Sequence, residues 1–450
     1  MRYSIAFAAL AAIAKAQDAL STASATSDFT IETTIPDHPA DALDFEGIKA
    51  AADPTYTEVP GLASQNVPYA TATAIEDAAA AITETPLTVF PAATDVAMNA
   101  DGESDNSSPT ATVVEKRDLS KRAACAAQPT IANTYNVDVS SYKNFKADIN
   151  IAVVANAATA PDGYYQNSKN LPVSLLRQGI ILCKLTASQG AQSAYAYLGY
   201  DQIKTGYDVN YCATRCNKKA GCLSFNIYFE RDPVQEPGFN GQCEQPAAFA
   251  NIKCSYWGSV LEDKTATNTG QWRSNFQVGI AGSNSYTSWS TGGPIDGCGS
   301  PLSLNNAVMN APLRDCQGTW TYMGYKIFTS GPYDPRLCKA ACDSQNDYNR
   351  AHPPTNSDNL AICSGFGSYL LTKTNSTAPG VYPQGQMCTL YTSGWGKQYA
   401  VNTASYDDGP GGGKFTYSAS YFYNVTALQP TCPVELSTIQ VLKRSRLFRF

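Results

Sequence analysis

The number and spacing of the cysteines constrain this chain more than any other feature of its sequence. The chain has 14 cysteines, all of them after residue 122, and no Cys-x-x-Cys pair occurs. An even set of this kind in an exported protein forms disulfides, whereas metal and redox sites use more closely spaced pairs. We therefore predict a disulfide-rich fold without a metal site.

Part of the chain is duplicated, and each copy contains a pair of cysteines four residues apart. The first copy contains, in order, Tyr197-Leu-Gly-Tyr200, Asp208, Cys212-Ala-Thr-Arg-Cys216 and Cys222-Leu-Ser-Phe225. The second contains Tyr322-Met-Gly-Tyr325, Asp334, Cys338-Lys-Ala-Ala-Cys342 and Cys363-Ser-Gly-Phe366. A repeat of about 125 residues is too long for a solenoid unit, so it predicts two domains.

The cysteine pair in each copy is predicted to lie on a short helix. Asp208 and Asp334 are placed as N-caps, and Pro335 suits the first helical turn, where its missing N–H costs nothing. Two cysteines four residues apart share one helical face, so both sulfurs reach the same neighbouring surface. The flanking aromatic and β-branched segments are predicted strands: Leu223–Phe229, Ser368–Leu371 and Phe415–Tyr423. Each module is therefore predicted to be α+β, an antiparallel sheet packed on one short helix.

The first 122 residues precede every cysteine and differ from the rest in composition. Residues 1–16 combine an early positive charge with a short apolar run and end in Ala14-Lys15-Ala16, which predicts a secretory signal peptide. Residues 17–122 have 5 basic and 18 acidic side chains, a net charge of −13, and only five aromatic residues. We expect this acidic, low-complexity segment to be a disordered leader with a transient helix around Ala70–Ala81.

Two Lys-Arg pairs end this leader, at Arg117 and Arg122. They are similar to sites of the fungal dibasic processing protease, and cleavage there would release a propeptide; two chance basic pairs in a linker are the alternative. The predicted division of the chain is a signal peptide (1–16), a propeptide (17–122), a first module (123–290), a linker (291–315), a second module (316–432) and a basic tail (433–450).

The cysteine pattern also resembles a known module. Tyr-Asp, Cys-x3-Cys, Cys-x-x-Phe and a later Cys follow each other in both copies, as in the PAN/apple module. Longer strings resemble a family of secreted fungal proteins with paired apple-like modules: Phe225–Pro233, Gly270–Arg273, Ile280–Asn284 and Ala351–Pro354. The resemblance covers roughly residues 183–426 and implies a helix held on an antiparallel sheet by disulfides. By analogy it also implies binding of protein or carbohydrate.

The resemblance implies four disulfides: Cys212–Cys254, Cys216–Cys222, Cys338–Cys388 and Cys342–Cys363. The second module carries an insertion, Asp343–Ile362, which we expect to lengthen the loop between its helix and the next strand. Six cysteines have no implied partner: Cys125, Cys183, Cys243, Cys298, Cys316 and Cys432.

Charge and histidine content exclude several classes of function. The net charge is −6, and residues 123–450 carry 25 basic against 20 acidic side chains, too balanced for a nucleic-acid binder. His38 and His352 are the two histidines, which excludes multi-histidine metal sites and leaves His352 as the imidazole base available after residue 122. No later segment reaches the ~18 apolar residues of a membrane helix. We expect no cofactor.

Aromatic residues are the best candidates for binding. All 5 tryptophans and most of the 27 tyrosines follow residue 122, among many Ser, Asn, Gly and Thr residues. Trp and Tyr pack on sugar rings and protein surfaces. The predicted binding residues are Trp257, Trp272, Trp289 and Trp395, with a role in the core as the alternative.

These features together predict a secreted protein, extracellular or associated with the cell wall. We expect it to bind cell-wall polysaccharide or an extracellular protein without catalysing a reaction. Asn375 and Asn424 begin predicted glycosylation sequons, which suit surface positions on an exported chain.

Two other functions remain open. Glu230 and Asp232 are carboxylates at the end of a predicted strand, and a secreted glycan hydrolase needs such a pair across a cleft. The alternating charges of Glu230-Arg231-Asp232 also fit a local ion pair and turn. A passive cell-wall component is the third interpretation. Asp407 and Asp408 lack the ligand spacing of a calcium loop and predict an acidic turn.

Overall fold

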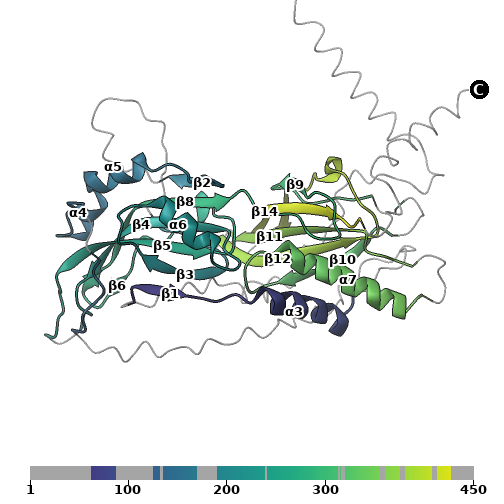
Figure 1. Ribbon diagram of the computed structural model, residues 1–450, viewed down its shortest axis with the longest axis horizontal. Coiled ribbons are helices and arrows are strands. Elements are labelled where there is room, and N and C mark those ends of the chain that lie inside the picture. Colours follow the sequence, from purple (N-terminus) through teal and green to yellow (C-terminus); the bar gives the residue numbers. More distant parts are fainter. Residues whose placement is uncertain are drawn as a thin grey trace, which may run out of the picture.

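The computed structural model describes residues 62–87, 125–131, 135–169, 190–238, 241–312, 315, 320–354, 360–375, 381–407 and 413–426. They form a mixed α+β protein whose two large antiparallel sheets lie end to end along the longest axis of the molecule (Figure 1). The predicted signal peptide, the dibasic sites at Arg117 and Arg122 and the basic tail 433–450 lie outside these ranges. Within them, no helix combines the length and the apolar character needed to cross a membrane.

The first sheet has six strands. Their spatial order is β1 (Ser64–Asn66), β3 (Tyr197–Gln202), β5 (Ala248–Trp257), β4 (Ser224–Pro233), β8 (Gly279–Ser288) and β2 (Tyr164–Lys169). A separate two-stranded ladder joins β6 (Trp272–Arg273) to β7 (Phe276–Gln277). The helices of this module are α4 (Tyr142–Lys146), α5 (Ile149–Ala157), α6 (Val209–Asn217) and the 3-10 turn η3 (Asp263–Thr265).

The second sheet has the order β10 (Tyr322–Phe328), β12 (Val381–Tyr391), β11 (Gly365–Asn375), β14 (Gly413–Asn424) and β13 (Ala404–Asp407), and β9 (Leu302–Asn305) also pairs with β14. Its helices are α7 (Pro335–Ala351) and the 3-10 turn η4 (Lys397–Tyr399). The order β3-β5-β4-β8 of the first sheet therefore recurs as β10-β12-β11-β14. The duplication seen in the sequence is a duplication of the fold.

The cysteine-bearing helices begin where their N-caps predict. The Asp208 carboxylate accepts a hydrogen bond of 2.9 Å from the Tyr211 amide, and the Asp334 carboxylate accepts one of 3.0 Å from the Arg336 amide. The two helices differ in length, since α6 has 9 residues and α7 has 17. The expectation that the insertion lengthens a loop was therefore wrong in part, because much of it extends α7.

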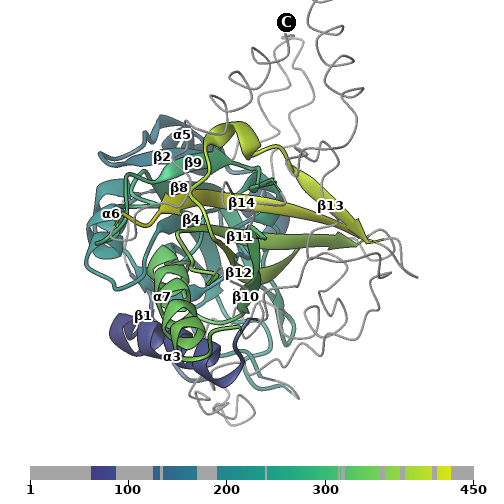
Figure 2. The same ribbon diagram turned by 90° about the vertical axis from the view of Figure 1, so that its right-hand side faces the viewer.

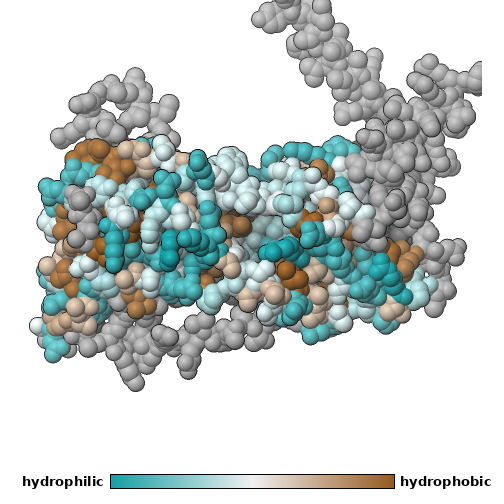
Figure 3. Space-filling view, in the orientation of Figure 1, coloured by the Kyte–Doolittle hydropathy of each residue, from teal (hydrophilic) through white to brown (hydrophobic). Residues whose placement is uncertain are grey.

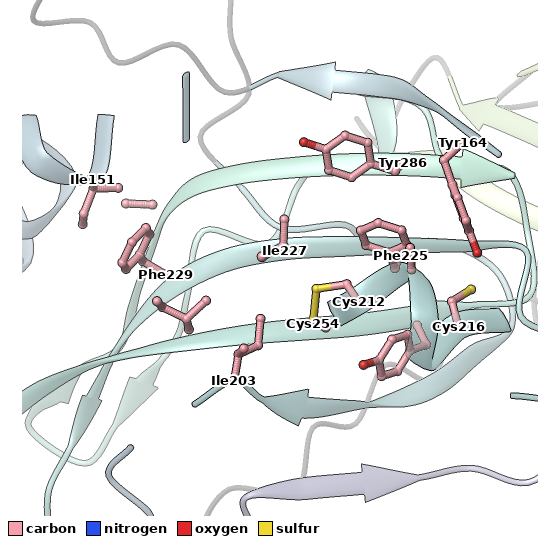
Figure 4. Close-up of a cluster of buried hydrophobic side chains, with 14 of the residues drawn as sticks. Ile151, Tyr164, Ile203, Cys212, Cys216, Phe225, Ile227, Phe229, Cys254 and Tyr286 are labelled. Carbon is pink, nitrogen blue, oxygen red and sulfur yellow. A yellow bond between two sulfur atoms is a disulfide. The ribbon is translucent and has the colours of Figure 1, made fainter. Parts of the chain in front are cut away.

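The core of the first module lies between its sheet and its helices. Strand β4 alternates, so that Phe225, Ile227 and Phe229 point to the same face, with Phe225 toward α6 and Phe229 toward Ile151 of α5 (Figure 4). Burying each such side chain stabilises the fold by roughly 1.5–3 kcal/mol. The disulfide Cys212–Cys254 joins α6 to β5 within this core.

The second sheet is covered on both faces. On the helix side, Leu337 and Cys338 of α7 pack against Phe366 and Leu390. A separate cluster contains Val308, Tyr369, Leu371, Met387, Phe415 and Tyr417. The surface in Figure 3 is largely polar, with an apolar area over α5, where Ile149 and Val153 are exposed.

Part of the leader is structured. Strand β1 pairs with β3 at the edge of the first sheet, and α3 (Thr71–Glu84) lies along α7 of the second module (Figure 2). The helix expected around Ala70–Ala81 is therefore present, but the disorder expected for this stretch is not. The other leader residues lie outside the described ranges.

Candidate functional site

Disulfides fix the framework on which any site must rest. The structure joins the four pairs that the resemblance implied: Cys212–Cys254, Cys216–Cys222, Cys338–Cys388 and Cys342–Cys363. It adds a fifth bridge, Cys125–Cys243, which the sequence left unassigned. Cys298 forms no disulfide with any residue that the structure describes, and Cys183, Cys316 and Cys432 lie outside those residues. Each cysteine helix is thus joined by one disulfide to a strand of its sheet, β5 or β12, and by a second to the residues just before β4 or β11.

Two of the four candidate tryptophans belong to the core. Trp257 on β5 is fully buried, and its indole N–H donates a hydrogen bond of 3.2 Å to the Ser255 hydroxyl. Trp395 is also buried and donates one of 3.0 Å to the Thr321 hydroxyl. A buried tryptophan with a satisfied N–H stabilises the fold and cannot contact a ligand. The prediction that these two bind a ligand was therefore wrong.

Trp289 lies on the surface in an ordered position. Its side chain is 69 % exposed, and its ring packs on that of Tyr165 with 4.4 Å between centroids and 42° between planes. The backbone amide of Trp289 donates a hydrogen bond of 2.9 Å to the carbonyl of Gly163. Tyr165 belongs to β2, and Trp289 directly follows β8, which pairs with β2. We call these two rings the aromatic platform.

Strand alternation explains why the platform exists. Tyr164 points into the core and packs on Phe225, so the next residue, Tyr165, points to the opposite face. The sequence analysis did not select Tyr165, although the consecutive tyrosines at the start of a strand carried this signal. Burial of the ring raises the pKa of the Tyr165 hydroxyl, which therefore stays a neutral hydrogen-bonding group at physiological pH.

Polar groups and a residue of the second module surround the platform. The hydroxyls of Ser288 and Ser290 lie 2.7 Å apart, next to Trp289 in the chain. Glu262, which is bound to Lys264 at 2.6 Å, adds to the effect of burial in raising the pKa of the Tyr165 hydroxyl. Burial, together with the nearby Tyr165, raises the pKa of Tyr421 on β14. Tyr421 also lies against Gly292, three residues after Trp289, where an added Cβ would be 2.3 Å from Cε1 of the Tyr421 ring, so the chain next to the platform contacts the second module.

Trp272 is exposed as well but does not belong to this platform. It is 64 % exposed and lies in β6, and the residue before it, Gln271, pairs with Val278 at the start of β8. Trp289 follows the far end of β8, which has 10 residues. At ~3.3 Å per residue, a strand of this length places the backbones of the two tryptophans about 30 Å apart. They cannot contact one short ligand together.

Glu230 and Asp232 are part of a buried ion-pair cluster. Both lie inside β4, and Lys253 of β5 contacts Glu230 at 2.5 Å and Asp232 at 3.4 Å. Asn251 donates a further hydrogen bond of 2.8 Å to Asp232. Arg231 points to the opposite face and binds the carbonyls of Val139 and Gln277. The expected local ion pair and turn was therefore wrong: the partner of the carboxylates is on the neighbouring strand.

The electrostatics of this cluster suit a structural role. Burial by itself raises the pKa of Asp232, but Lys253 and the hydrogen bonds to the carboxylate outweigh it and hold the pKa below its usual value. The cavity beside the cluster has room for little more than one water molecule, and Leu62 of the leader lines it. A glycan-cleaving pair needs a protonated acid and space for a sugar. The cavity is too small for a sugar, and the pKa of Asp232 is lowered rather than raised.

The remaining candidate residues lie apart from the platform. His352 caps the C-terminal end of α7 and stacks on Tyr348 with 4.3 Å between ring centroids. Asn375 ends β11 and the half-buried Asn424 ends β14. Within the described ranges, no three His, Cys, Asp or Glu side chains converge as metal ligands would.

Comparisons with known proteins give no identity for this arrangement. No protein-family model, curated protein or solved structure matches the chain. The role of the aromatic platform is therefore inferred from its own geometry.

Proposed function

We propose that this chain is an extracellular binding protein with two apple-like modules, and that the aromatic platform of Trp289 and Tyr165 is its ligand site. The observation that carries the proposal is a tryptophan left 69 % exposed although its backbone and its ring are both fixed. An ordered, exposed aromatic ring loses little conformational entropy on binding, so most of the free energy of its contact with a ligand contributes to the affinity.

Cell-wall polysaccharide is the ligand class that fits the platform best. The flat face of an indole packs on the apolar face of a sugar ring, and nearby hydroxyls bind the sugar hydroxyls. Ser288 and Ser290 supply such hydroxyls next to Trp289. An extracellular protein is the alternative partner, and the binding experiment distinguishes the two.

The apple-like assignment and the extracellular location have their own support. In both modules one helix is bound by disulfides to an antiparallel sheet, as the resemblance implied. Five disulfides among the described residues favour an oxidising compartment. The carboxylates at Glu230 and Asp232, which were the candidates for hydrolysis, are buried and paired with Lys253, and this supports binding over hydrolysis at that place.

The test uses retention of the full chain on insoluble β-glucan, chitin and mannan, and on immobilised extracellular protein. We expect retention on a polysaccharide, and Trp289→Ala should weaken it by about tenfold or more. Trp272→Ala is the matched control, because it removes an equally exposed indole whose backbone lies about 30 Å away. Equal retention of the two variants would exclude the platform as the binding site. Retention on immobilised protein alone would identify a protein, and not a polysaccharide, as the partner.

A further inference from the structure

Residues 62–87 of the leader bind across both modules. Figure 1 shows β1 beneath the first sheet and α3 beneath the second, joined by a short connection. The segment precedes the dibasic pairs at Arg117 and Arg122, so cleavage there would break the covalent link between it and the modules that it contacts. Its contacts therefore determine what happens to it after such a cut.

The first anchor is the edge of β3. Ser64, Gln65 and Asn66 pair in antiparallel register with Asp201, Tyr200 and Gly199. The Gln202 amide donates a hydrogen bond of 2.8 Å to the Ala63 carbonyl, and the Val67 amide donates one of 3.1 Å to the Leu198 carbonyl. The Tyr200 hydroxyl donates one of 2.6 Å to the Leu62 carbonyl. The leader adds a strand to the sheet, which is a common way to bind an extended peptide.

The second anchor is the surface of α7. The Leu87 amide donates a hydrogen bond of 2.8 Å to the Gln345 side chain, whose amide group donates one of 3.1 Å back to the Leu87 carbonyl. Ser344 donates one of 2.9 Å to the Ala79 carbonyl. Ala78 and Ile82 of α3 are buried, with Ala78 in the core cluster of the second module. An apolar helical face thus lies against α7 in the manner of a helix bound in a groove.

The two ends of the segment contact equivalent places in the duplicated fold. Gly199 on β3 and Gly324 on β10 occupy matching positions, and both have positive φ values, +103° and +112°. A Cβ added at Gly199 would lie 2.0 Å from the Gln65 carbonyl oxygen, whereas one at Gly324 would lie 3.4 Å from Leu87, an ordinary contact. Leader binding therefore requires a residue without a side chain at position 199, whereas a side chain at position 324 would leave the leader in place.

We propose that the two modules carry a peptide-binding surface made of the β3 edge and the α7 face, and that residues 62–87 are its ligand, bound in cis. The surface accepts an extended strand followed by a helix with a small-residue apolar face. After the chain is cut between residues 87 and 125, the leader stays bound without a covalent link, so the processed protein consists of two chains. This inference does not depend on the aromatic platform.

The experiment uses the full chain with a site-specific protease sequence in place of residues 115–122, cut after purification. Size-exclusion chromatography under native conditions, followed by mass spectrometry, then shows which fragments travel together. We expect the fragment containing residues 62–87 to co-elute with residues 123–450. Elution of that fragment alone, while circular dichroism shows the larger fragment still folded, would overturn the proposal.

Two pairs of matched variants locate the surface. Ile82→Asp should release the cut leader, whereas Ala80→Asp, which adds the same charge at an exposed position of α3, should not. Both changes lie in the leader and leave the modules intact. Gly199→Ala should release it, whereas Gly324→Ala imposes a similar backbone cost without touching the leader backbone. Retention of the leader in Ile82→Asp would exclude the α7 face, and retention in Gly199→Ala would exclude the β3 edge.

Discussion

The backbone amide of Tyr333 donates a hydrogen bond of 2.7 Å to the carbonyl oxygen of Gly258 and so joins the second module to the first. Gly258 follows β5, and Tyr333 precedes α7. The neighbouring Pro332 lies directly over Gly258, where an added Cβ would meet the Pro332 Cβ at 2.5 Å and its Cα at 2.7 Å. At this point the two modules therefore meet through a backbone hydrogen bond and the Pro332 ring, which leave no room for a side chain at residue 258.

Gly258→Ala should loosen this junction. The new methyl group forces the modules apart, and we expect the free energy of unfolding to fall by about 1–3 kcal/mol, as for other overpacked sites. Denaturant unfolding monitored by tryptophan fluorescence measures the loss. Gly293→Ala is the control, because its Cβ would meet only the Ser290 carbonyl at 3.4 Å; an equal loss in both variants would contradict the role of the junction.

The two disulfides of α6 should differ in their contribution to stability. Cys212–Cys254 closes a loop of 42 residues and Cys216–Cys222 one of 6. A disulfide stabilises mainly by restricting the unfolded chain, so the longer loop should contribute more. Replacing Cys212 and Cys254 by alanine should lower the free energy of unfolding by about 4 kcal/mol, and replacing Cys216 and Cys222 should lower it by about 2 kcal/mol. Thermal unfolding of the two double variants checks the order. A larger loss from the short loop would show that native-state packing dominates instead.

Lys146 should make stability depend on pH in the alkaline range. Burial lowers its pKa to about 8, and its ammonium group lies on the carbonyl of Ile280 at 2.5 Å. The unfolded chain has the ordinary lysine pKa of about 10.4, so it binds more protons than the folded chain between pH 8 and 10. The free energy of unfolding should therefore rise over this range, because the cost of burying the charge disappears.

Lys146→Met removes that cost at every pH. We expect a gain of up to about 3 kcal/mol at pH 7 and a weaker rise between pH 8 and 10. Urea unfolding at pH 7, 8.5 and 10 gives the comparison. Lys143→Met changes an exposed lysine of the same helix and should leave the profile as in the parent chain; a profile unaffected by Lys146→Met would refute the assignment.

Lys253 should be the most sensitive charged residue of the first module. Lys253→Met leaves Glu230 and Asp232 buried without their cation, which typically costs about 3–5 kcal/mol. Lys264→Met breaks the partly exposed pair with Glu262 and should cost about 1 kcal/mol or less. Melting temperatures at neutral pH distinguish the two.

The same variant has a predicted acid dependence. Because Lys253 helps to hold the pKa of Asp232 low, the stability that this carboxylate contributes is present above its unfolded pKa of about 3.9 and is lost as the pH falls below that value. The difference between Lys253→Met and the parent chain should therefore narrow below about pH 4. A difference that stays constant into acid would mean that packing, not charge, explains the loss.

The local features of the fold follow from short-range sequence signals. Asp208 and Asp334 start helices because an N-cap acts on the next turn, and cysteines four residues apart share a face because of helical geometry. The partner of Glu230 could not be predicted in this way. Lys253 lies 23 residues further along the chain, and only the register of β4 against β5, which pairs Lys253 with Tyr228, brings its side chain within reach of both carboxylates.

Exposure was the least predictable property. Trp257 ends β5 and Trp289 directly follows β8, yet one is fully buried and the other 69 % exposed, because Ala194 and Leu261 pack on Trp257 and Trp289 has no such cover among the described residues. In the leader, a segment distant in sequence likewise changes the outcome, here by stabilising a stretch that was expected to be disordered. Its average composition indicates disorder, but the apolar spacing of Ala78 and Ile82 becomes stabilising once α7 supplies a surface.

The position of α3 on α7 has a consequence for synthesis. Leu87 and its partner Gln345 are 258 residues apart in the chain. At about 5–20 residues per second, a ribosome completes α3 roughly 10–50 s before it completes the helix that α3 packs against. A helix that is made early is thus among the last described elements to find its packing partner, and its apolar face stays uncovered by α7 until Pro335–Ala351 has been made.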